Sequence, residues 1–500
     1  MSNHVQARKK NETEIIIECS DSGILQEISE FFTFYANGYK FMPAYRNKLW
    51  DGRIRLLNLR NNTLPYGLLF HLSEFCKDRD YEFATTLLIP PADPIETAKF
   101  LANVPLFYNG KEIQIRDYQL AAFNYAIANK RGVLVSPTGS GKSLIIYLLA
   151  RHYLLQPTSS KKIMIIVPTT SLVEQLYKDF AEYSSQDGAF GVAENVHQIY
   201  SGKEKLSFAQ NIVITTWQSA ITMKPEWFLQ FGGVIGDEAH QFKAVSLTKI
   251  MNNLQNAWFR IGTTGTLDGT MVNKLVLEGC FGPVYQVTTT KDLIASNTLA
   301  QLKIFVLALK YSDEIRKGLG KLDYAQELDF LVGYQPRNNF ITNLAVSLKG
   351  NTLVLFNYVE KHGKPLHTQI QNKLKDTGRK LFFVSGAVPA LQREEIREIT
   401  EKENGAIIVA SMGTFAVGVN IRNLHNIVMA SPTKSQIRLL QSIGRGLRKS
   451  DDGRGTAIYD LADDLCWKKR KNYTLAHALA RIEIYRKEKF GFETHEVPLS

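Results

Sequence analysis

Short apolar runs alternate with longer segments of helical spacing from about Gly110 to the end of the chain. This alternation predicts parallel α/β sheets, because each run is long enough for a buried strand and each intervening segment can return the chain as a helix. The first series of runs predicts five strands of one sheet, at residues 132–136, 162–168, 211–216, 232–237 and 259–264.

A second series of apolar runs predicts another sheet of the same kind, and a charged segment separates the two series. We therefore expect two lobes that join near residues 288–300. The predicted strands of the second sheet are 352–356, 380–386, 405–411, 426–431 and 455–461.

The two ends of the chain follow other patterns. The first hundred residues lack the alternation and predict a separate small α/β (α+β) domain, whereas residues 473–490 place apolar side chains along one helical stripe. The predicted divisions are an N-terminal domain (1–105), a first lobe (106–290), a second lobe (291–470) and a C-terminal helix (471–500).

Composition narrows the class of protein. Of the 500 residues, 44% are hydrophobic and 22% charged, which excludes a largely disordered chain. The net charge of +12 favours a polyanionic partner. The start of the chain is polar and basic, no apolar stretch reaches the length of a membrane span, and four scattered cysteines suggest neither zinc nor disulfides. We expect a cytoplasmic location without a membrane.

The glycine-rich segment SPTGSGKS, residues 136–143, follows the strand at 132–136 and precedes an apolar helical stretch. It predicts a phosphate-binding loop, because glycines let backbone amides turn toward phosphate oxygens. Lys142 is expected to reach the terminal phosphates of ATP, and the Ser143 hydroxyl to bind magnesium. The alternative is a Gly/Ser turn. The residues assigned to the nucleotide are Thr138, Gly139, Ser140, Gly141, Lys142 and Ser143.

Two adjacent carboxylates, Asp237 and Glu238, begin the sequence DEAH after the strand at 232–237, at the sheet edge where parallel-sheet proteins bind nucleotides. Hydrolysis needs one carboxylate on the metal ion and another near the attacking water. We assign Asp237 to the magnesium ion, with Ser143, and Glu238 to activating the water. The alternative is an acidic cap on the following helix.

In the second predicted sheet, QSIGRGLR at residues 441–448 places two arginines three residues apart. Arg445 and Arg448 are candidates for arginine fingers that stabilise charge on the transferred phosphate, and Gln441 for sensing the water or the phosphate. The alternative is a solvated basic helix face. The predicted catalytic residues are thus Lys142, Asp237, Glu238, Gln441, Arg445 and Arg448.

Taken in order, these segments resemble the motifs of superfamily two helicases, from about Arg116 to Asp464. The resemblance implies two tandem RecA-like lobes. IRDYQ (115–119) resembles the family's adenine-reading element, which assigns Arg116 and Gln119 to the nucleotide. GTTGT (262–266) stands where the family usually has Ser-Ala-Thr and couples hydrolysis to strand movement.

Further segments extend the same resemblance. PTTSLVEQ (168–175) and TTWQS (215–219) resemble motifs that touch the nucleic-acid backbone, while FNYVEKHG (356–363) and ASMGTFAVGVN (410–420) resemble the second-lobe set. The residues that the resemblance assigns to nucleic acid are Pro168, Thr169, Gln175, Thr216 and Thr414, and those that it assigns to the nucleotide are Gly418 and Asn420.

The N-terminal passage at residues 31–57, which contains WDGRIRLL, is similar to that of UvsW-type recombination helicases of bacteriophages. Its aromatic and basic residues interleave, as suits stacking and phosphate contact. The alternative is that Tyr45 and Trp50 are the core of the small domain, and the basic segment WKKRK (467–471) is likewise either a solvated linker or a DNA contact. The residues assigned to nucleic acid here are Lys48, Trp50, Arg53 and Arg55.

The resemblance implies an ATP- and magnesium-dependent DNA helicase that acts on branched DNA, including stalled forks, Holliday junctions and RNA–DNA loops, with 3′ to 5′ polarity. Recombination or single-strand-binding proteins are the expected protein partners, in a host cytoplasm. Two alternatives stay open: an RNA helicase, since the motifs do not read the 2′-hydroxyl, and a nucleotide-gated clamp that binds without unwinding. The motor of a restriction system lacks support, because no nuclease carboxylate cluster accompanies the lobes.

Overall fold

The computed structural model describes residues 4–36, 38–87, 94–156, 161–200, 208–241, 244–265, 267, 271–375, 377–414, 421, 423–432, 444 and 453–499. The chain forms two compact units, which meet in the sequence between Val287 and Thr288, although residues 137–140 group with the second unit. No helix in this described part is long and apolar enough to cross a membrane.

The first unit begins with a small four-stranded sheet in the order β5-β2-β1-β6. Buried and exposed side chains alternate along its strands β1 and β2. The buried residues Val5, Ala7, Ile15 and Ile17 pack against α1 and α3, as expected for a sheet with one covered face. Asp21 starts α1 by accepting hydrogen bonds from Gly23 N and Ile24 N. The elements are β1 (His4–Lys9), β2 (Glu14–Cys19), α1 (Ser22–Phe31), β5 (Thr63–Pro65), α3 (Leu69–Asp78) and β6 (Glu82–Thr85).

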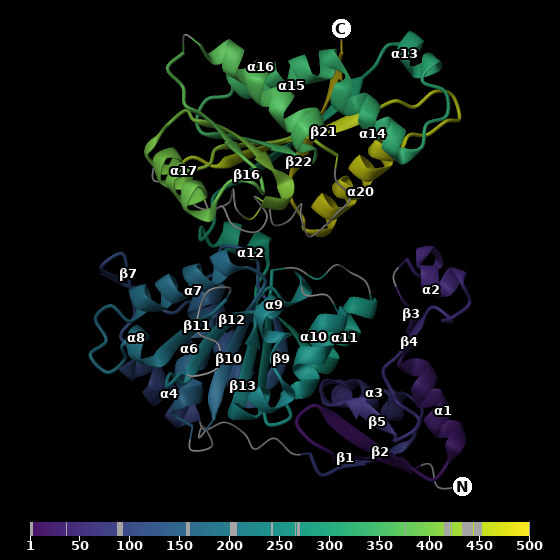
Figure 1. Ribbon diagram of the computed structural model, residues 1–500, viewed down its shortest axis with the longest axis vertical. Coiled ribbons are helices and arrows are strands. Elements are labelled where there is room, and N and C mark those ends of the chain that lie inside the picture. The colour runs from purple at the N-terminus through teal and green to yellow at the C-terminus, as the bar shows by residue number, and fades with distance from the viewer. Residues whose placement is uncertain are drawn as a thin grey trace. The chain divides into compact units, whose positions relative to one another are not determined.

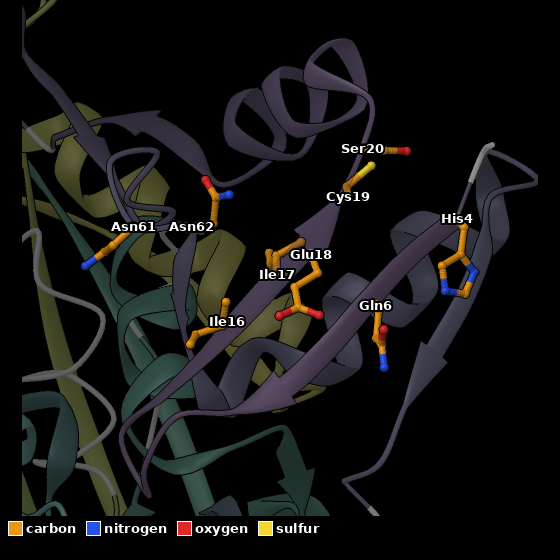
Figure 2. A pocket seen from close by; sticks show the side chains of 9 residues that line it. All are labelled: His4, Gln6, Ile16, Ile17, Glu18, Cys19, Ser20, Asn61 and Asn62. Carbon is orange, nitrogen blue, oxygen red and sulfur yellow. The ribbon is translucent and has the colours of Figure 1, made fainter. Parts of the chain in front are cut away.

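The other face of this sheet carries a pocket of about 480 Å³ (Figure 2). His4 and Gln6 on β1 line it together with Glu18 on β2 and Asn61 and Asn62 ahead of β5. None of the sequence-predicted site residues belongs to this lining. The pocket therefore lies apart from the predicted chemistry.

A two-stranded extension interrupts the small domain between α1 and β5. Its strands β3 (Thr33–Tyr35) and β4 (Arg53–Arg55) pair antiparallel, and the turn between them carries η1 (Tyr39–Phe41) and α2 (Pro43–Arg46). Neither η1 nor α2 buries a residue. We call residues 33–55 the arm.

Close contacts hold the small domain on the first lobe within this unit. The Arg131 guanidinium lies 4.0 Å from the Tyr66 ring centroid and donates to Glu12 Oε2 at 2.9 Å. A Cβ at Gly67 would lie 1.9 Å from the Glu278 carbonyl oxygen. Only glycine permits this approach of the two backbones.

The first lobe contains a seven-stranded parallel sheet in the order β11-β12-β10-β13-β14-β9-β15 (Figure 1). Helices α5, α6 and α7 cover one face, and α10 and α11 cover the other. The strands are β9 (Arg131–Val135), β10 (Lys162–Val167), β11 (Val196–Ile199), β12 (Ile212–Thr216), β13 (Phe231–Gly236), β14 (Phe259–Thr264) and β15 (Val284–Gln286). The helices are α5 (Asp117–Asn129), α6 (Lys142–Leu154), α7 (Thr170–Tyr183), α10 (Ala244–Asn253) and α11 (Met271–Phe281).

The second unit repeats this design with a parallel sheet in the order β18-β19-β17-β20-β21-β16-β22. Helices α14, α15 and α16 cover one face, and α20 packs on β21. The strands are β16 (Leu302–Lys310), β17 (Thr352–Phe356), β18 (Leu381–Val384), β19 (Ile407–Ser411), β20 (Asn426–Met429), β21 (Thr456–Asp464) and β22 (Phe492–Pro498). The helices are α14 (Tyr324–Gly333), α15 (Gln335–Ser347), α16 (Lys364–Leu374), α17 (Ala390–Lys402) and α20 (Tyr473–Lys487).

The predicted fold class is confirmed: two parallel-sheet lobes follow a small domain, and all ten predicted strands are present. The prediction of five strands in each sheet was wrong, because each sheet has two more. The added strands β11, β15 and β22 are short or exposed, and β16 carries lysines among its apolar residues. The end of the chain forms the predicted helix and then β22, which completes the second sheet beside β16.

Candidate functional site

The phosphate loop joins β9 to α6 in the first lobe. Gly139 and Gly141 have φ values of 86° and 84°, in the left-handed region that favours glycine. A Cβ at Gly141 would also lie 2.3 Å from Gln119 Nε2. These two glycines therefore let the backbone turn sharply just before α6 begins at Lys142.

Gln119 is brought to this loop by the start of α5. Its Oε1 accepts a hydrogen bond from Arg116 N at 3.0 Å, which closes a capping box, and the side chain is buried. Arg116 itself is exposed and donates to Tyr118 Oη at 2.9 Å. Of the two residues that the resemblance assigns to the nucleotide here, Gln119 is the one whose side chain lies against Gly141 of the loop.

The two carboxylates of DEAH lie at the carboxyl end of β13, beside the phosphate loop. Lys142 Nζ donates to Glu238 Oε1 at 3.0 Å, and the two side chains are only 12% and 16% exposed. Glu238 has a φ of 48°, an uncommon conformation for a residue with a side chain. Such backbone strain often accompanies functional positions.

Burial and neighbouring charges shift the pKa values of the two carboxyl groups in opposite directions. Burial, followed by the charge of Glu238, raises the pKa of Asp237. Burial alone would also raise the pKa of Glu238, but Lys142 and then His240 outweigh it and hold that pKa at about 2. Glu238 is thus ionised at neutral pH.

Two threonines of the GTTGT motif, at the end of β14, form hydrogen bonds with the DEAH segment. Thr263 Oγ1 donates to Asp237 Oδ1 at 2.6 Å, and His240 Nδ1 shares a hydrogen bond with Thr264 Oγ1. Both motifs were identified in the sequence, but no role was predicted for His240 or Thr263. Their partnership depends on β13 and β14 being neighbours in the sheet.

The residues at this edge fit a triphosphate and a divalent cation. Glu238 Oε2 is buried and accepts no hydrogen bond from the described residues. The Ser143 hydroxyl, assigned to magnesium, shares a hydrogen bond of 2.9 Å with Tyr183 Oη. No sequence motif indicated Tyr183, which lies at the end of α7.

The two segments predicted to touch the nucleic-acid backbone lie at the ends of the neighbouring strands β10 and β12. Thr169 caps α7 and Thr216 caps the short helix α9 (Trp217–Ala220), each through its hydroxyl. Gln218 Nε2 donates to the Pro168 carbonyl at 3.1 Å and so links the two motifs. Gln175 is exposed on α7, whereas Pro168 and Thr216 are buried.

The arm brings Arg53 and Tyr35 together, with the guanidinium 5.1 Å from the ring centroid. Trp50 Nε1 donates to Arg53 O at 2.9 Å, and Arg55 pairs with Asp51. Lys48 is exposed with a φ of 56°. The alternative that Tyr45 and Trp50 form the core of the small domain is wrong, since both are only partly buried.

In the second lobe, Thr414 Oγ1 accepts a hydrogen bond from Ser411 Oγ at 2.7 Å. The other predicted residues of this lobe lie outside the described residues: Gly418, Asn420, Gln441, Arg445 and Arg448.

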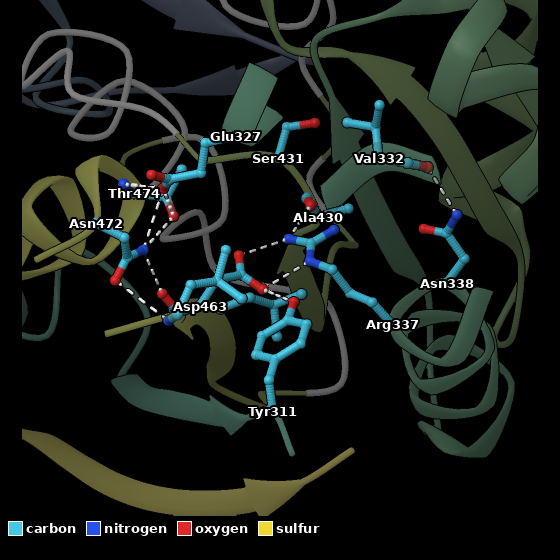
Figure 3. A network of polar contacts seen from close by, with 12 residues as sticks. Tyr311, Glu327, Val332, Arg337, Asn338, Ala430, Ser431, Asp463, Asn472 and Thr474 are labelled. Atoms are coloured by element: carbon cyan, nitrogen blue, oxygen red, sulfur yellow. Dashed lines mark hydrogen bonds and ion pairs between the residues drawn. The ribbon is translucent and has the colours of Figure 1, made fainter. Parts of the chain in front are cut away.

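A buried charged network occupies the carboxyl edge of the second sheet (Figure 3). Arg337 donates to both oxygens of Asp463, at 2.8 and 3.0 Å, and Tyr311 Oη donates to Asp463 Oδ1 at 2.7 Å. Glu327 accepts the backbone amides of Tyr473 and Thr474 and thereby caps α20. The network fixes α14, α15 and α20 on the sheet.

Comparisons with known proteins agree with this geometry. Residues 5–86 match the family model "DNA helicase UvsW, N-terminal", residues 112–269 match "Type III restriction enzyme, res subunit", and residues 337–450 match "Helicase conserved C-terminal domain". The ATP-dependent DNA helicase uvsW of Enterobacteria phage T4 is 35% identical over 97% of this chain and 98% of its own length.

A solved structure of the phage T4 protein and one further relative give the same result. The crystal structure of T4 UvsW aligns with 100% of both chains, at 32% identity and a TM-score of 0.52. The DNA 3′-5′ translocase XPB2 of Sulfurisphaera tokodaii is 23% identical over 70% of this chain and 84% of its own length.

Proposed function

Because the chain belongs to the UvsW family of ATP-dependent DNA helicases, we propose that its substrate is branched DNA and that it moves 3′ to 5′. The chain is itself an ATP-dependent DNA helicase. Stalled forks, four-way junctions and RNA–DNA loops are the expected substrates, in a host cytoplasm and with recombination or single-strand-binding proteins as partners. The name of XPB2 supports the polarity.

The Lys142–Glu238 pair carries the proposed hydrolysis step. Lys142 donates to Glu238 in the structure, and in the proposed step it moves from this carboxylate to a phosphate. Glu238 then loses the cation that holds its pKa low while it stays buried, and it becomes a better acceptor for the proton of the attacking water.

Magnesium neutralises developing phosphate charge when it is bound, and we assign Ser143 and Asp237 to hold it. Thr263 fixes the Asp237 carboxylate for this task through its 2.6 Å hydrogen bond. Arg445, Arg448 and Gln441 are proposed to act on the nucleotide from the second lobe, with Gly418 and Asn420 near it. The proposed divisions remain 1–105, 106–290, 291–470 and 471–500, and the last of these contributes α20 and β22 to the second lobe.

We assign the DNA contacts to two regions of the first unit. The segments at 168–175 and 215–219, at the starts of α7 and α9, would bind the nucleic-acid backbone. The arm would stack on bases or sugars through Trp50, with phosphate contacts from Lys48, Arg53 and Arg55. The exposure of the arm and its lack of buried residues in η1 and α2 support this assignment.

The test is ATP hydrolysis and branch migration on a synthetic four-way DNA junction, with the wild type beside Lys142→Ala. The wild type should hydrolyse ATP faster with the junction and migrate it, and Lys142→Ala should do neither. Equal hydrolysis with and without nucleic acid, with no migration, would contradict the proposal.

Two arms of this experiment separate the rival functions. RNA of matched length should stimulate hydrolysis less than DNA; the reverse would favour an RNA helicase. A clamp would hold the junction without migrating it. Migration by the wild type that is lost in Glu238→Gln, while junction binding persists, would exclude the clamp.

A further inference from the structure

Two lysines form the tip of a tight turn beyond the carboxyl end of β21. The backbones of Trp467 and Arg470 exchange two hydrogen bonds, of 3.1 Å from Trp467 N and 2.9 Å from Arg470 N. Lys468 and Lys469 lie between them, and both are exposed. The basic segment 467–471 is therefore an ordered hairpin turn and not a loose linker. We call it the lysine turn.

Arg316 on α13 (Asp313–Gly318) supports the lysine turn. Its guanidinium lies 5.7 Å from the Trp467 ring centroid and donates to Cys466 O at 3.3 Å, and its carbonyl accepts from Arg470 Nη2. The guanidinium groups of Arg316 and Arg470 thus hold the turn in place. The side chains of Lys468 and Lys469 take no part in these contacts.

The backbone of Lys468 is strained in a way that its surroundings do not explain. Its φ is 51°, and three other lysines in the described part of the chain, Lys48, Lys130 and Lys489, also have positive φ. Those three follow the helices α2, α5 and α20, where left-handed residues are usual and a cation interacts well with the helix dipole. Lys468 follows a strand, in a turn that favours Asn or Gly.

The side chains of Lys468, Lys469 and Lys471 make no ion pair or hydrogen bond with any described residue. Two carboxylates beside the turn are paired with other cations: Asp464 with Lys310 at 2.9 Å, and Asp313 with Arg316. Glu327 accepts the backbone amides of Tyr473 and Thr474 and forms no ion pair with the three lysines. The tip of the turn therefore carries exposed positive charge that no described carboxylate pairs. Ligands of parallel sheets bind at this edge.

We infer that the lysine turn binds the phosphate backbone of the DNA on which the helicase acts. This inference rests on the proposed function, and of the two alternatives that the sequence left open for residues 467–471, a solvated linker or a DNA contact, it selects the DNA contact. The charge of Lys468 explains why a lysine occupies a position that favours Asn or Gly. The contact is independent of base sequence, because it is made to phosphates.

The full-length variant Lys468→Asn with Lys469→Gln tests the inference, since Asn fits the left-handed backbone and the charge is removed. Binding to a labelled four-way DNA junction is measured by anisotropy across a salt series. We expect the slope of log affinity against log salt to become shallower by roughly one to two, and the affinity near 0.15 M salt to fall roughly tenfold. Arginine at both positions should restore both values.

The matched control is Lys349→Gln with Lys375→Gln. These exposed lysines precede β17 and β18, at the opposite edge of the same sheet, so the control removes equal charge and should keep the wild-type slope. A lysine-turn variant that behaves like this control overturns the inference. If its melting temperature falls, Lys469→Gln alone, compared with Lys375→Gln alone, decides in the same way.

Failure of the inference and failure of the proposed function give different results. If the wild type shows no DNA-stimulated hydrolysis, both fail. If the wild type is stimulated and migrates the junction while the lysine-turn variant keeps its salt slope, only the lysine turn is wrong.

Discussion

The carboxyl edges of the two sheets treat buried charge in opposite ways. In the first lobe, Glu238 pairs with Lys142 through one oxygen, and its other oxygen lies 3.5 Å from His240 Nδ1 and accepts no hydrogen bond from the described residues. In the second lobe, both oxygens of Asp463 are bonded to Arg337, and Tyr311 adds a third bond (Figure 3). One edge keeps an ion pair that can be exchanged, and at the other edge both carboxylate oxygens of Asp463 are bonded.

This difference arises from side chains, because the two sheets share one topology. Their strand orders correspond position by position, so that β9 corresponds to β16 and β14 to β21. An exchangeable ion pair suits a site where a ligand replaces one partner, whereas a buried pair with every carboxylate bond made suits a fixed support. We therefore expect substitutions at the carboxyl edge of the first sheet to affect activity. Substitutions at the carboxyl edge of the second sheet should affect stability.

The largest effect should come from Glu238→Gln at the first edge. It keeps the shape of the side chain but removes the acceptor for the proton of water, so ATP hydrolysis should fall by roughly 10² to 10⁴. The measurement is steady-state phosphate release with junction DNA. Lys310→Ala, which breaks the ion pair with Asp464 at the second edge, is the control and should leave hydrolysis nearly unchanged. A similar loss in both variants would remove the distinction between the edges.

Arg337→Leu should have the next largest effect, on stability. It leaves the Asp463 carboxylate buried without its cation, which costs about 3 to 5 kcal/mol of unfolding free energy. This loss of unfolding free energy is measured by urea unfolding, with hydrogen exchange of the second-lobe strands as the readout. Lys361→Ala breaks an exposed pair with Asp329 and should cost less than about 1 kcal/mol. Equal costs would show that the network is not a support.

Acid should destabilise the second lobe through His362. Burial, and then the positive charge of Arg337, lowers the pKa of His362 to about 3. Between an unfolded pKa of about 6.5 and the folded value, the unfolded chain binds more protons. Stability is therefore complete above about pH 6.5 and falls toward pH 3, by at most about 1.4 kcal/mol per pH unit from this group. His362→Gln should flatten the pH dependence of unfolding; an unchanged slope would contradict the assignment.

Thr263→Val should have the smallest effect, again on activity. It keeps the shape of the side chain but removes the hydroxyl that donates to Asp237, so hydrolysis should fall roughly tenfold, as for one hydrogen bond to a charged group. Phosphate release across a magnesium series measures it. Thr342→Val removes a bond between neutral groups, to Gln369 in the second lobe, and should keep the wild-type rate. Equal rates in both variants would exclude a role for Thr263.

Sequence patterns predicted the centre of each sheet better than its rim. Central strands such as β10 and β17 are apolar along almost their whole length, because helices cover both faces. Strand β16 has Lys303 and Lys310 beside its apolar residues, and β22 is mostly exposed. At the rim, pairing with a neighbouring strand decides the structure, and that neighbour is distant in the sequence.

The two-lobed class, the glycine-rich loop and the pair of acids could be predicted from the sequence, because each depends on local spacing: a strand, a glycine-rich turn and a helix, or two acids at a strand end. Which groups meet could not be predicted, because it depends on how distant segments pack. Lys142 and Glu238 are 96 residues apart, and Arg337 and Asp463 are 126 apart. Their contacts depend on strand order and packing, which set the burial and hence the pKa of each group.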